Sequence, residues 1–397
     1  MRLSFLTIRD MLILLGASLI ATKGYTAPEV AQTYIRARQL CEHLDDPHQR
    51  FPVLRGLWIY YLTCAELQTT YELSEQLLIL AQQAQDTTML VVAHRVLGAT
   101  LFQLGAVADA HAHFTQGIAC YDAQQHRTSA LLYGEDAGVI CHSLDAWMLW
   151  FLGYPDQGKM RNDAAVTLAQ QSAHPFSLSF ILSFAAISHQ FRREERCTQE
   201  RARAAISLAK EQGFPHWIAH GSILCGWALV QQGQTQEGIE QIHLGLTTYR
   251  ATGAEILRPY FLMLLAEAHG TIGEPEAGLT ALAEALTLVD SSGERFYEAE
   301  LHRLKGELLL QGSSENSTEA ETCFQQAVSI ARSQQAKSWE LRAATSLARL
   351  LRQQRKRQEA YDLLAPVYHW FTEGFDTADL QDAKALLDAL GEQRHDI

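Results

Sequence analysis

Apolar residues along the chain fall into blocks of helical length, separated by short polar turns. The blocks come in pairs, which predicts helical hairpins over residues 3–43, 51–85, 89–122, 140–172, 177–212, 217–252, 257–291, 296–334 and 338–372. Residues 123–139 break the phase of the pattern and are expected to form a long connection, and residues 376–390 a last helix. The pattern therefore predicts an all-α protein.

Small and large residues recur in a fixed order inside these blocks. A small residue in the middle of an apolar helix is followed by Gly after seven residues, Ala or Gly after five more, a large apolar residue after four and a small one after three. Three copies are Gly98, Gly105, Ala110, Phe114, Gly117; Gly226, Gly233, Gly238, Ile242, Gly245; and Ala266, Gly273, Gly278, Leu282, Ala285. Because one hairpin cannot bury its apolar face alone, such units are expected to stack in an array.

These spacings resemble the tetratricopeptide repeat. From Gly226 to Ala266 and from Ala266 to Gly306 are 40 residues each, so the period is longer than the usual repeat of about 34. The resemblance implies a right-handed superhelical solenoid of about nine hairpins. We expect residues 1–375 to form one array, with a possible break at 123–139, and residues 376–397 to form a capping helix and tail.

The opening stretch, MRLSFLTIRDMLILLGASLIATKGYTAPEV, has two interpretations. Its short apolar run after two arginines is of the length found in secretory leaders. Placing Gly16 at the first small position of the repeat instead puts Tyr34 and Ala37 at the later large and small positions, and we favour this second interpretation. Seven scattered cysteines without a C-x-x-C motif indicate reduced thiols, and no later apolar run is long enough to cross a membrane. We therefore expect a cytoplasmic protein.

Longer phrases extend the resemblance over nearly the whole chain. ATKGYTAPEV, HQFRRE, EQGFPHW, ATGAEILRPYFLMLLAEAHG and GERFYEAELHRLKGELLL are similar to the C-terminal repeat region of large bacterial signalling proteins. In those proteins an adenylate or guanylate cyclase or a DNA-binding module precedes a predicted ATPase and then tetratricopeptide-like repeats. The chain has no G-x-x-x-x-G-K-[ST] motif and no stretch of alternating strands and helices. Either the repeats work alone, or the chain is the C-terminal fragment of such an enzyme.

The sequence gives no support for catalysis, a cofactor or a metal site. His111 and His113 are two residues apart, so on a helix they point in different directions. The chain contains no H-E-x-x-H motif, Cys/His cluster, G-x-S-x-G motif or nucleophilic cysteine signature. We therefore predict a protein that is not an enzyme.

Charged and aromatic residues at predicted inner positions indicate partner contacts. Residues three before, one after and four after the first small residue of a repeat are expected to line the concave groove. These positions hold Trp227, Glu267, Arg303, Glu307, Arg349 and Arg352, and Arg342 shares one helical face with Arg349 and Arg352, so all seven are predicted to contact a partner. The segment 332–357 carries eight basic residues and one acid in a chain of net charge -13, which favours an acidic partner over nucleic acid.

These observations predict a scaffold that binds a protein or peptide along the concave groove, as a sensory or regulatory module of bacterial signalling. One alternative is a fragment that regulates its own cyclase or ATPase in cis. The other is a nucleic-acid adaptor that uses its basic segment; charge reversal of Arg355, Lys356 and Arg357 would test it.

Overall fold

The computed structural model describes residues 8–41, 46–124, 133–172 and 174–391, and all regular secondary structure in these ranges is helical. The helices are α1 (Ile8–Lys23), α2 (Pro28–Cys41), α3 (Pro47–Thr63), α4 (Leu67–Ala84), α5 (Thr87–Gln103), α6 (Val107–Cys120), α8 (Ala137–Phe151), α9 (Pro155–Ser172), α10 (Pro175–Phe191), α11 (Glu195–Gln212), α12 (Pro215–Gln231), α13 (Thr235–Ala251), α14 (Arg258–Thr271), α15 (Pro275–Ser292), α16 (Glu298–Gly312), the 3-10 turn η1 (Ser314–Asn316), α17 (Ser317–Ser333), α18 (Lys337–Gln353), α19 (Arg357–Tyr368) and α20 (Ala378–Gly391). The all-α prediction is confirmed.

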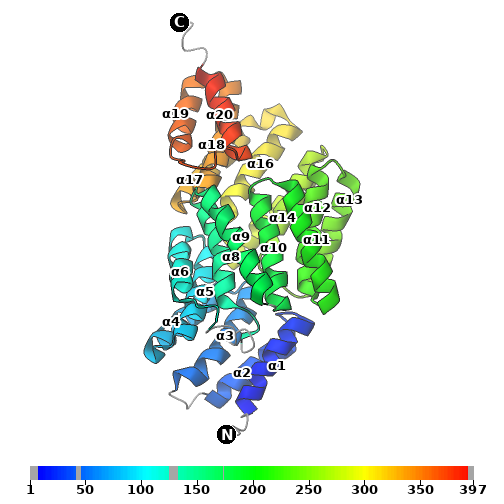
Figure 1. Cartoon of the computed structure of the whole chain (residues 1–397). Helices are drawn as coiled ribbons and strands as arrows, with labels where there is room; N and C mark the ends of the chain where they lie inside the picture. The colour runs from blue at the N-terminus through cyan, green and yellow to red at the C-terminus, as the bar shows by residue number, and fades with distance from the viewer. Residues whose placement is uncertain (1–7, 42–45, 125–132, 173, 392–397) are drawn as a thin grey trace.

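Successive helices pack as antiparallel pairs, from α1/α2 through to α18/α19, and the described ranges hold nine such hairpins. The last helix, α20, packs on α18 and α19. The N-terminal hairpin lies at one end of an elongated molecule and α19 with α20 at the other (Figure 1). The predicted start of the second hairpin at residue 51 is wrong, because Asp46 caps α3 through the His48 amide and Pro47 takes its first position.

The predicted pairing of small with large residues is confirmed at several repeats. A Cβ placed on Gly16 would lie 2.5 Å from a ring carbon of Tyr34, and one on Gly98 would lie 2.8 Å from Phe114. Both distances are too short for real contacts, so these positions need glycine for the ring to fit. The turns that follow repeat as regularly, since residues with positive φ stand 40 residues apart at Gly153, Arg193, Gly233 and Gly273.

Hairpins five apart in the sequence touch across the turn of the superhelix. The carbonyl of Thr63, at the end of α3, accepts a hydrogen bond of 2.9 Å from the amide of Glu255, just before α14. The carbonyl of Gln103, at the end of α5, accepts one of 2.7 Å from the amide of Arg295, before α16. Further along, Ser338 of α18 donates to the carbonyl of Trp150. Helix ends leave carbonyls without partners, and the next superhelical turn supplies the donors for Thr63 and Gln103.

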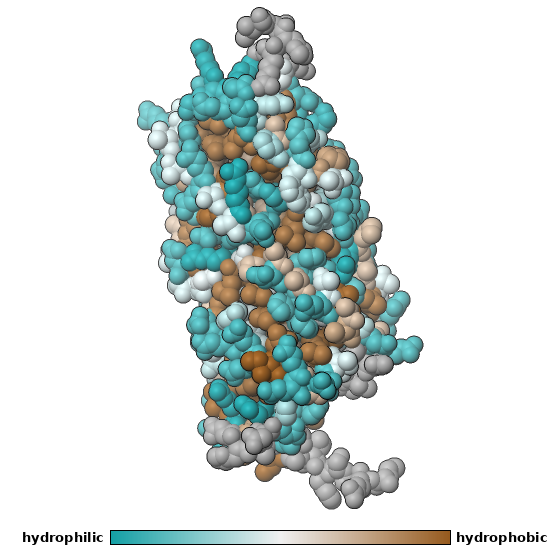
Figure 2. Space-filling view, turned by 90° about the vertical axis from the view of Figure 1, so that its left-hand side faces the viewer, coloured by the Kyte–Doolittle hydropathy of each residue, from teal (hydrophilic) through white to brown (hydrophobic). Residues whose placement is uncertain are grey.

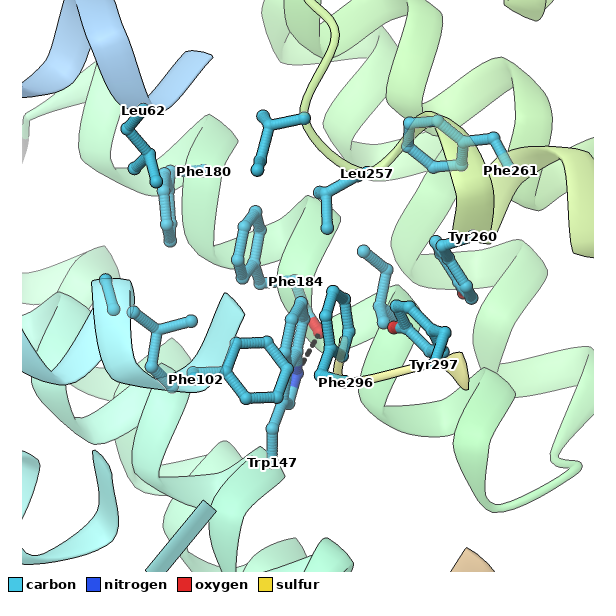
Figure 3. Packing of buried hydrophobic residues seen from close by; sticks show 14 of the residues in the cluster. Leu62, Phe102, Trp147, Phe180, Phe184, Leu257, Tyr260, Phe261, Phe296 and Tyr297 are labelled. Atoms are coloured by element: carbon cyan, nitrogen blue, oxygen red, sulfur yellow. Dashed lines mark hydrogen bonds between the residues drawn. The ribbon is translucent and has the colours of Figure 1, made fainter. Parts of the chain in front are cut away.

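Aromatic side chains fill the space between these turns (Figure 3). The rings of Phe102 and Phe296, from hairpins five apart, have centroids 4.1 Å apart. Trp147 stacks on Phe184 at 4.5 Å and donates its indole N–H to the carbonyl of that residue. Trp150 packs edge-on against Trp339 at 4.8 Å. The inner surface of the middle repeats therefore packs against the following superhelical turn through these rings.

The outside of the molecule mixes hydrophobic and hydrophilic side chains. On the face shown in Figure 2, hydrophobic patches are interrupted by hydrophilic groups from one end to the other. None of the helices in the described ranges is long and apolar enough to cross a membrane. Six of the seven cysteines, Cys64, Cys120, Cys141, Cys197, Cys225 and Cys323, are free thiols, and Cys197 is exposed.

Candidate functional site

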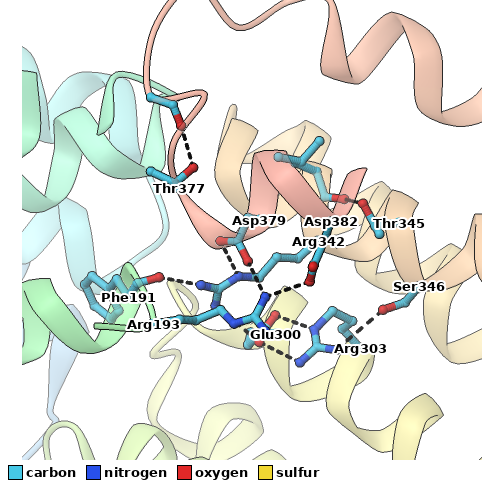
Figure 4. Close-up of polar contacts among 12 residues, drawn as sticks. Phe191, Arg193, Glu300, Arg303, Arg342, Thr345, Ser346, Thr377, Asp379 and Asp382 are labelled. Carbon is cyan, nitrogen blue, oxygen red and sulfur yellow. Dashed lines mark hydrogen bonds and ion pairs between the residues drawn. The ribbon is translucent and has the colours of Figure 1, made fainter. Parts of the chain in front are cut away.

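A polar crevice of about 170 Å³ opens near the C-terminal end of the solenoid. Five helices of the solenoid and the turn after α10 bring its lining together, because the superhelical turn places α10 beside α18 and α20 (Figure 4). The lining residues are Gln190, Arg193, Glu267, Glu300, Arg303, Arg342, Thr345, Ser346, Arg349, Asp379 and Asp382. Four arginines and four carboxylates therefore face one small space.

The floor of the crevice is a largely buried ion-pair network centred on α16. Arg303 donates two hydrogen bonds of 2.8 Å to the two carboxylate oxygens of Glu300 and one of 3.2 Å to Glu307. Ser346 of α18 donates to the same oxygen of Glu307 at 2.6 Å. Burial alone would lower the pKa of Arg303, but the facing carboxylates of Glu300 and Glu307 raise it. The guanidinium is held charged in one fixed orientation.

Arg342 of α18 joins the floor to the last helix. Its Nε donates to Asp379 of α20 at 2.8 Å, and its Nη2 donates to the carbonyl of Phe191 at the end of α10. Its guanidinium also lies 4.9 Å from the ring centre of Trp339. Stacking and hydrogen bonding together fix an arginine more firmly than either would alone. Arg342 therefore ties three separate parts of the array to one another.

The rim of the crevice is more open and carries an excess of positive charge. Arg193 and Arg349 are 46% and 44% exposed and both face Asp382, at 2.9 and 3.5 Å. Arg193 also donates to Oδ1 of Asp379 at 3.3 Å, while Oδ2 of the same carboxylate accepts from Arg342. Three guanidinium groups, those of Arg193, Arg342 and Arg349, therefore share the two carboxylates of α20.

Glu267 and Trp227 form one wall of the crevice. The indole N–H of Trp227 donates to Glu267 at 2.9 Å, and the Trp227 side chain is almost completely buried. Burial raises the pKa of Glu267, and the nearby Glu300 carboxylate raises it further. Trp227 contributes to the crevice by orienting Glu267.

Four of the seven predicted contact residues line this crevice: Glu267, Arg303, Arg342 and Arg349. Of the other three, Glu307 is bonded to Arg303, Trp227 lies behind Glu267, and Arg352 is exposed outside the lining. The sequence did not point to Arg193, Asp379 or Asp382, because they belong to an interhelical turn and to the last helix. No repeat spacing marks a contact across the superhelical turn.

The basic segment 332–357 does not form one free positive patch. Arg332 and Lys337 both bind Glu340 at 2.7 Å. Arg342 and Arg349 are paired with the carboxylates of α20. Four of the eight basic residues of the segment are therefore paired with carboxylates within the fold, which weakens the case for nucleic-acid binding.

One group of side chains in the described ranges has metal-like spacing, with ligand atoms of His189, Glu194 and Cys197 within 4.8 Å of one another. The Glu194 carboxylate already binds His189 at 2.6 Å and the Arg192 guanidinium at 2.7 Å. A guanidinium on the same carboxylate opposes a bound cation. We therefore assign no metal to this group.

Comparison with known proteins places the fold. The crystal structure of a Rap protein complexed with competence and sporulation factor matches with a TM-score of 0.57 at 10% identity, over 89% of this chain and 86% of that chain. The APC/C hetero-tetramer Cut9-Hcn1 matches with a TM-score of 0.56 at 11% identity, over 97% of this chain and 64% of that chain. The fold is a tetratricopeptide-like helical solenoid. At such identities the likeness concerns the fold alone.

The sequence comparisons are sparser. No protein-family model matches the chain. An uncharacterized protein of Rhizobium meliloti (strain 1021) is 25% identical over 340 residues. The match covers 85% of this chain but only 33% of that protein, so the chain spans about a third of the length of the relative.

Proposed function

We propose that the chain is a non-enzymatic protein-interaction module of a bacterial signalling system and that the polar crevice binds an acidic segment of its partner. The observation that carries the proposal is the convergence of four residues predicted to contact a partner, from three helices, on one crevice. The free cysteines support a reducing, cytoplasmic setting.

The ion pairs at the rim of the crevice can be exchanged for ion pairs with a partner. Exposed ion pairs are worth about 0–1 kcal/mol each, so the pairs of Arg193 and Arg349 with Asp382 can be replaced by pairs with a carboxylate from a partner at little cost. The buried pairs of Arg303 and Arg342 are expensive to break and stay in place. The partner is therefore recognised by its charge at the rim and by its fit to a preformed floor.

Charge reversal on α18 provides the test. Arg349→Glu changes a residue of the rim, whereas Arg352→Glu makes the same change three residues away on the same helix, outside the lining. Tagged wild-type and variant proteins are expressed in the native host, captured partners are quantified by mass spectrometry, and binding is repeated with purified components.

We expect a partner that the wild type and Arg352→Glu capture equally and that Arg349→Glu loses by at least tenfold, about 1.4 kcal/mol. A captured partner that both variants retain, or that both lose to the same extent, would count against the crevice. Unchanged far-ultraviolet circular dichroism in both variants excludes misfolding as the cause.

A second candidate is regulation in cis, as the arm of a longer signalling enzyme. It is favoured by the length of the Rhizobium meliloti relative, of which the chain covers 33%. The intact mass of the native protein tests it. A mass well above 44.4 kDa supports an arm of a longer protein, and a mass of 44.4 kDa supports a separate module.

A further inference from the structure

The middle of the superhelix contains a second site, which shares no residue with the polar crevice. It is a cavity of about 70 Å³ between the two superhelical turns, walled mainly by apolar and aromatic side chains such as Phe102, Trp147, Phe180 and Phe184. Its polar lining residues include Arg95, Gln103, His216, Trp217 and His220. Each of the five is more than nine-tenths buried.

These polar residues present atoms that have no hydrogen-bond partner among the described residues. They are Nε and Nη1 of Arg95, Oε1 of Gln103, Nδ1 of His216, Nε1 of Trp217 and both ring nitrogens of His220. A buried polar atom without a partner costs about 1–3 kcal/mol. Seven such atoms around one cavity indicate a place that a polar ligand group completes.

The charge at the cavity identifies the kind of group. Arg95 and Arg55 both bind the single carboxylate of Glu135, Arg95 through Nη2 at 3.0 Å, and all three side chains are at most 5% exposed. The trio therefore carries a net charge of +1 inside the protein. Burial lowers the pKa of both His216, to about 3, and His220, so neither imidazole adds charge. A buried positive charge in excess is costly unless an anion pairs with it.

Space for a ligand continues beyond Tyr25. This residue lines both the central cavity and a second cavity of about 330 Å³ beside α1 and α10, which Arg55, Glu135 and the half-exposed Leu14 also line. The Tyr25 ring is held by edge contacts to His216 at 5.1 Å and to Phe176 at 6.1 Å. A cavity of about 150 Å³ is enough for benzene, so displacement of the Tyr25 ring joins the two spaces into a site for a small ring.

We propose that the interior of the superhelix binds a small aromatic carboxylic acid, with its ring among the aromatic side chains and its carboxylate on a free N–H group of Arg95. The donors, the charge and the walls agree on this class: a charged guanidinium N–H suits a carboxylate, and apolar walls suit a ring. The ligand would reach the cavity from the side of α1, through the space next to Tyr25.

The test uses three probes on the full chain, with binding measured by isothermal titration calorimetry and by fluorescence of the lining residues Trp147 and Trp217. Benzoate carries the ring and the charge, benzamide the ring alone and acetate the charge alone. We expect benzoate to bind at least tenfold more tightly than either of the others, because hydrogen bonds to a charged group are the stronger ones.

Arg95→Met is the matched variant, with Arg196→Met on the exposed face of α11 as its control. The Arg95→Met protein keeps a neutral pair of Arg55 with Glu135, so we expect it to fold and to bind benzoate only as weakly as benzamide. Arg196→Met should bind benzoate as the wild type does. The proposal is overturned if benzoate and benzamide bind equally to the wild type, if Arg95→Met binds benzoate unchanged, or if none of the probes binds and the cavity holds only water. The wild-type comparison decides the question even if Arg95→Met fails to fold.

Discussion

A close approach of α12 and α13 is set by glycine on both sides, which makes Gly226→Ala a sharp test of the repeat packing. A Cβ on Gly226 of α12 would lie 2.5 Å from the carbonyl oxygen of Gly238 and 2.9 Å from the amide nitrogen of Ile242, both in the backbone of α13. Backbone atoms cannot turn aside as a side chain can, so the two helices must separate.

The expected cost follows from two opposing effects. Overpacking a tight contact costs about 1–3 kcal/mol or more, whereas alanine gains about 1 kcal/mol over glycine inside a helix. We expect a net loss of about 2 kcal/mol, because the obstructing atoms are backbone. Gly270→Ala is the control, since its Cβ would meet only Leu308 Cδ2 at 2.7 Å and Gln311 Oε1 at 3.4 Å, which are ends of flexible side chains. That change should be neutral or stabilise by up to about 1 kcal/mol.

Urea unfolding followed by circular dichroism compares the two variants, and hydrogen exchange shows where the loss occurs. Repeat arrays unfold locally, so exchange should increase in α12 and α13 before it does elsewhere. A Gly226→Ala protein as stable as the wild type, or more stable than Gly270→Ala, would refute the claim that small residues set the spacing of the hairpins.

Three further changes test other parts of the structure. Phe296→Ala removes a buried ring from the contact between superhelical turns and should cost about 3–5 kcal/mol and expand the particle in small-angle scattering, whereas the exposed Phe375→Ala should do neither. Glu300→Gln removes the charge that Arg303 needs in the crevice floor and should cost about 3 kcal/mol in urea unfolding, against less than about 1 kcal/mol for Glu274→Gln in an exposed pair. Burial raises the pKa of Glu294 to about 8, so the folded protein keeps a proton that the unfolded chain releases above about pH 4.5. The contribution of Glu294 to stability should therefore fall by about 3–5 kcal/mol as the pH rises from 4.5 to 8, and it should appear as the difference between the wild type and Glu294→Gln in pH-dependent unfolding.

Each of the three has an outcome that contradicts it. A compact, fully stable Phe296→Ala protein would mean that the turns do not depend on the ring contact. Equal effects of Glu300→Gln and Glu274→Gln would mean that the buried network adds nothing. A Glu294→Gln protein with the pH profile of the wild type would place the titrating group elsewhere.

Local spacing was enough to predict the hairpins. The order of small and large residues reflects contacts between the two helices of a hairpin, such as that of Gly98 with Phe114. The helix pairs and most of their bounds therefore follow from it. The start of a helix was predicted wrongly where its N-cap residue lies before the apolar block, as Asp46 does before α3. Three residues of the crevice, Glu267, Arg303 and Arg349, were found in the same way, because inner positions recur once in each repeat, and Arg342 was found because it shares a helical face with Arg349.

Contacts across the superhelical turn could not be predicted, because they depend on the sum of many small rotations between hairpins. Nothing in the sequence near Arg193 indicates that it faces Asp379 and Asp382, almost 190 residues later. The same is true of the aromatic contacts between the superhelical turns, such as that of Phe102 with Phe296. The charged pair inside the solenoid could have been noticed in the sequence. Arg55 and Arg95 stand 40 residues apart, in the apolar first helices of two successive hairpins.

Hydrogen exchange with and without the captured partner tests the central claim, partner binding at the crevice, most directly. The account predicts that the partner slows exchange in the peptides of α18 and α20 that carry Arg349 and Asp382 and leaves the outer helices α4 and α6 unchanged. Protection confined to α4, α6 or the other outer helices, with α18 and α20 unaffected, would contradict it.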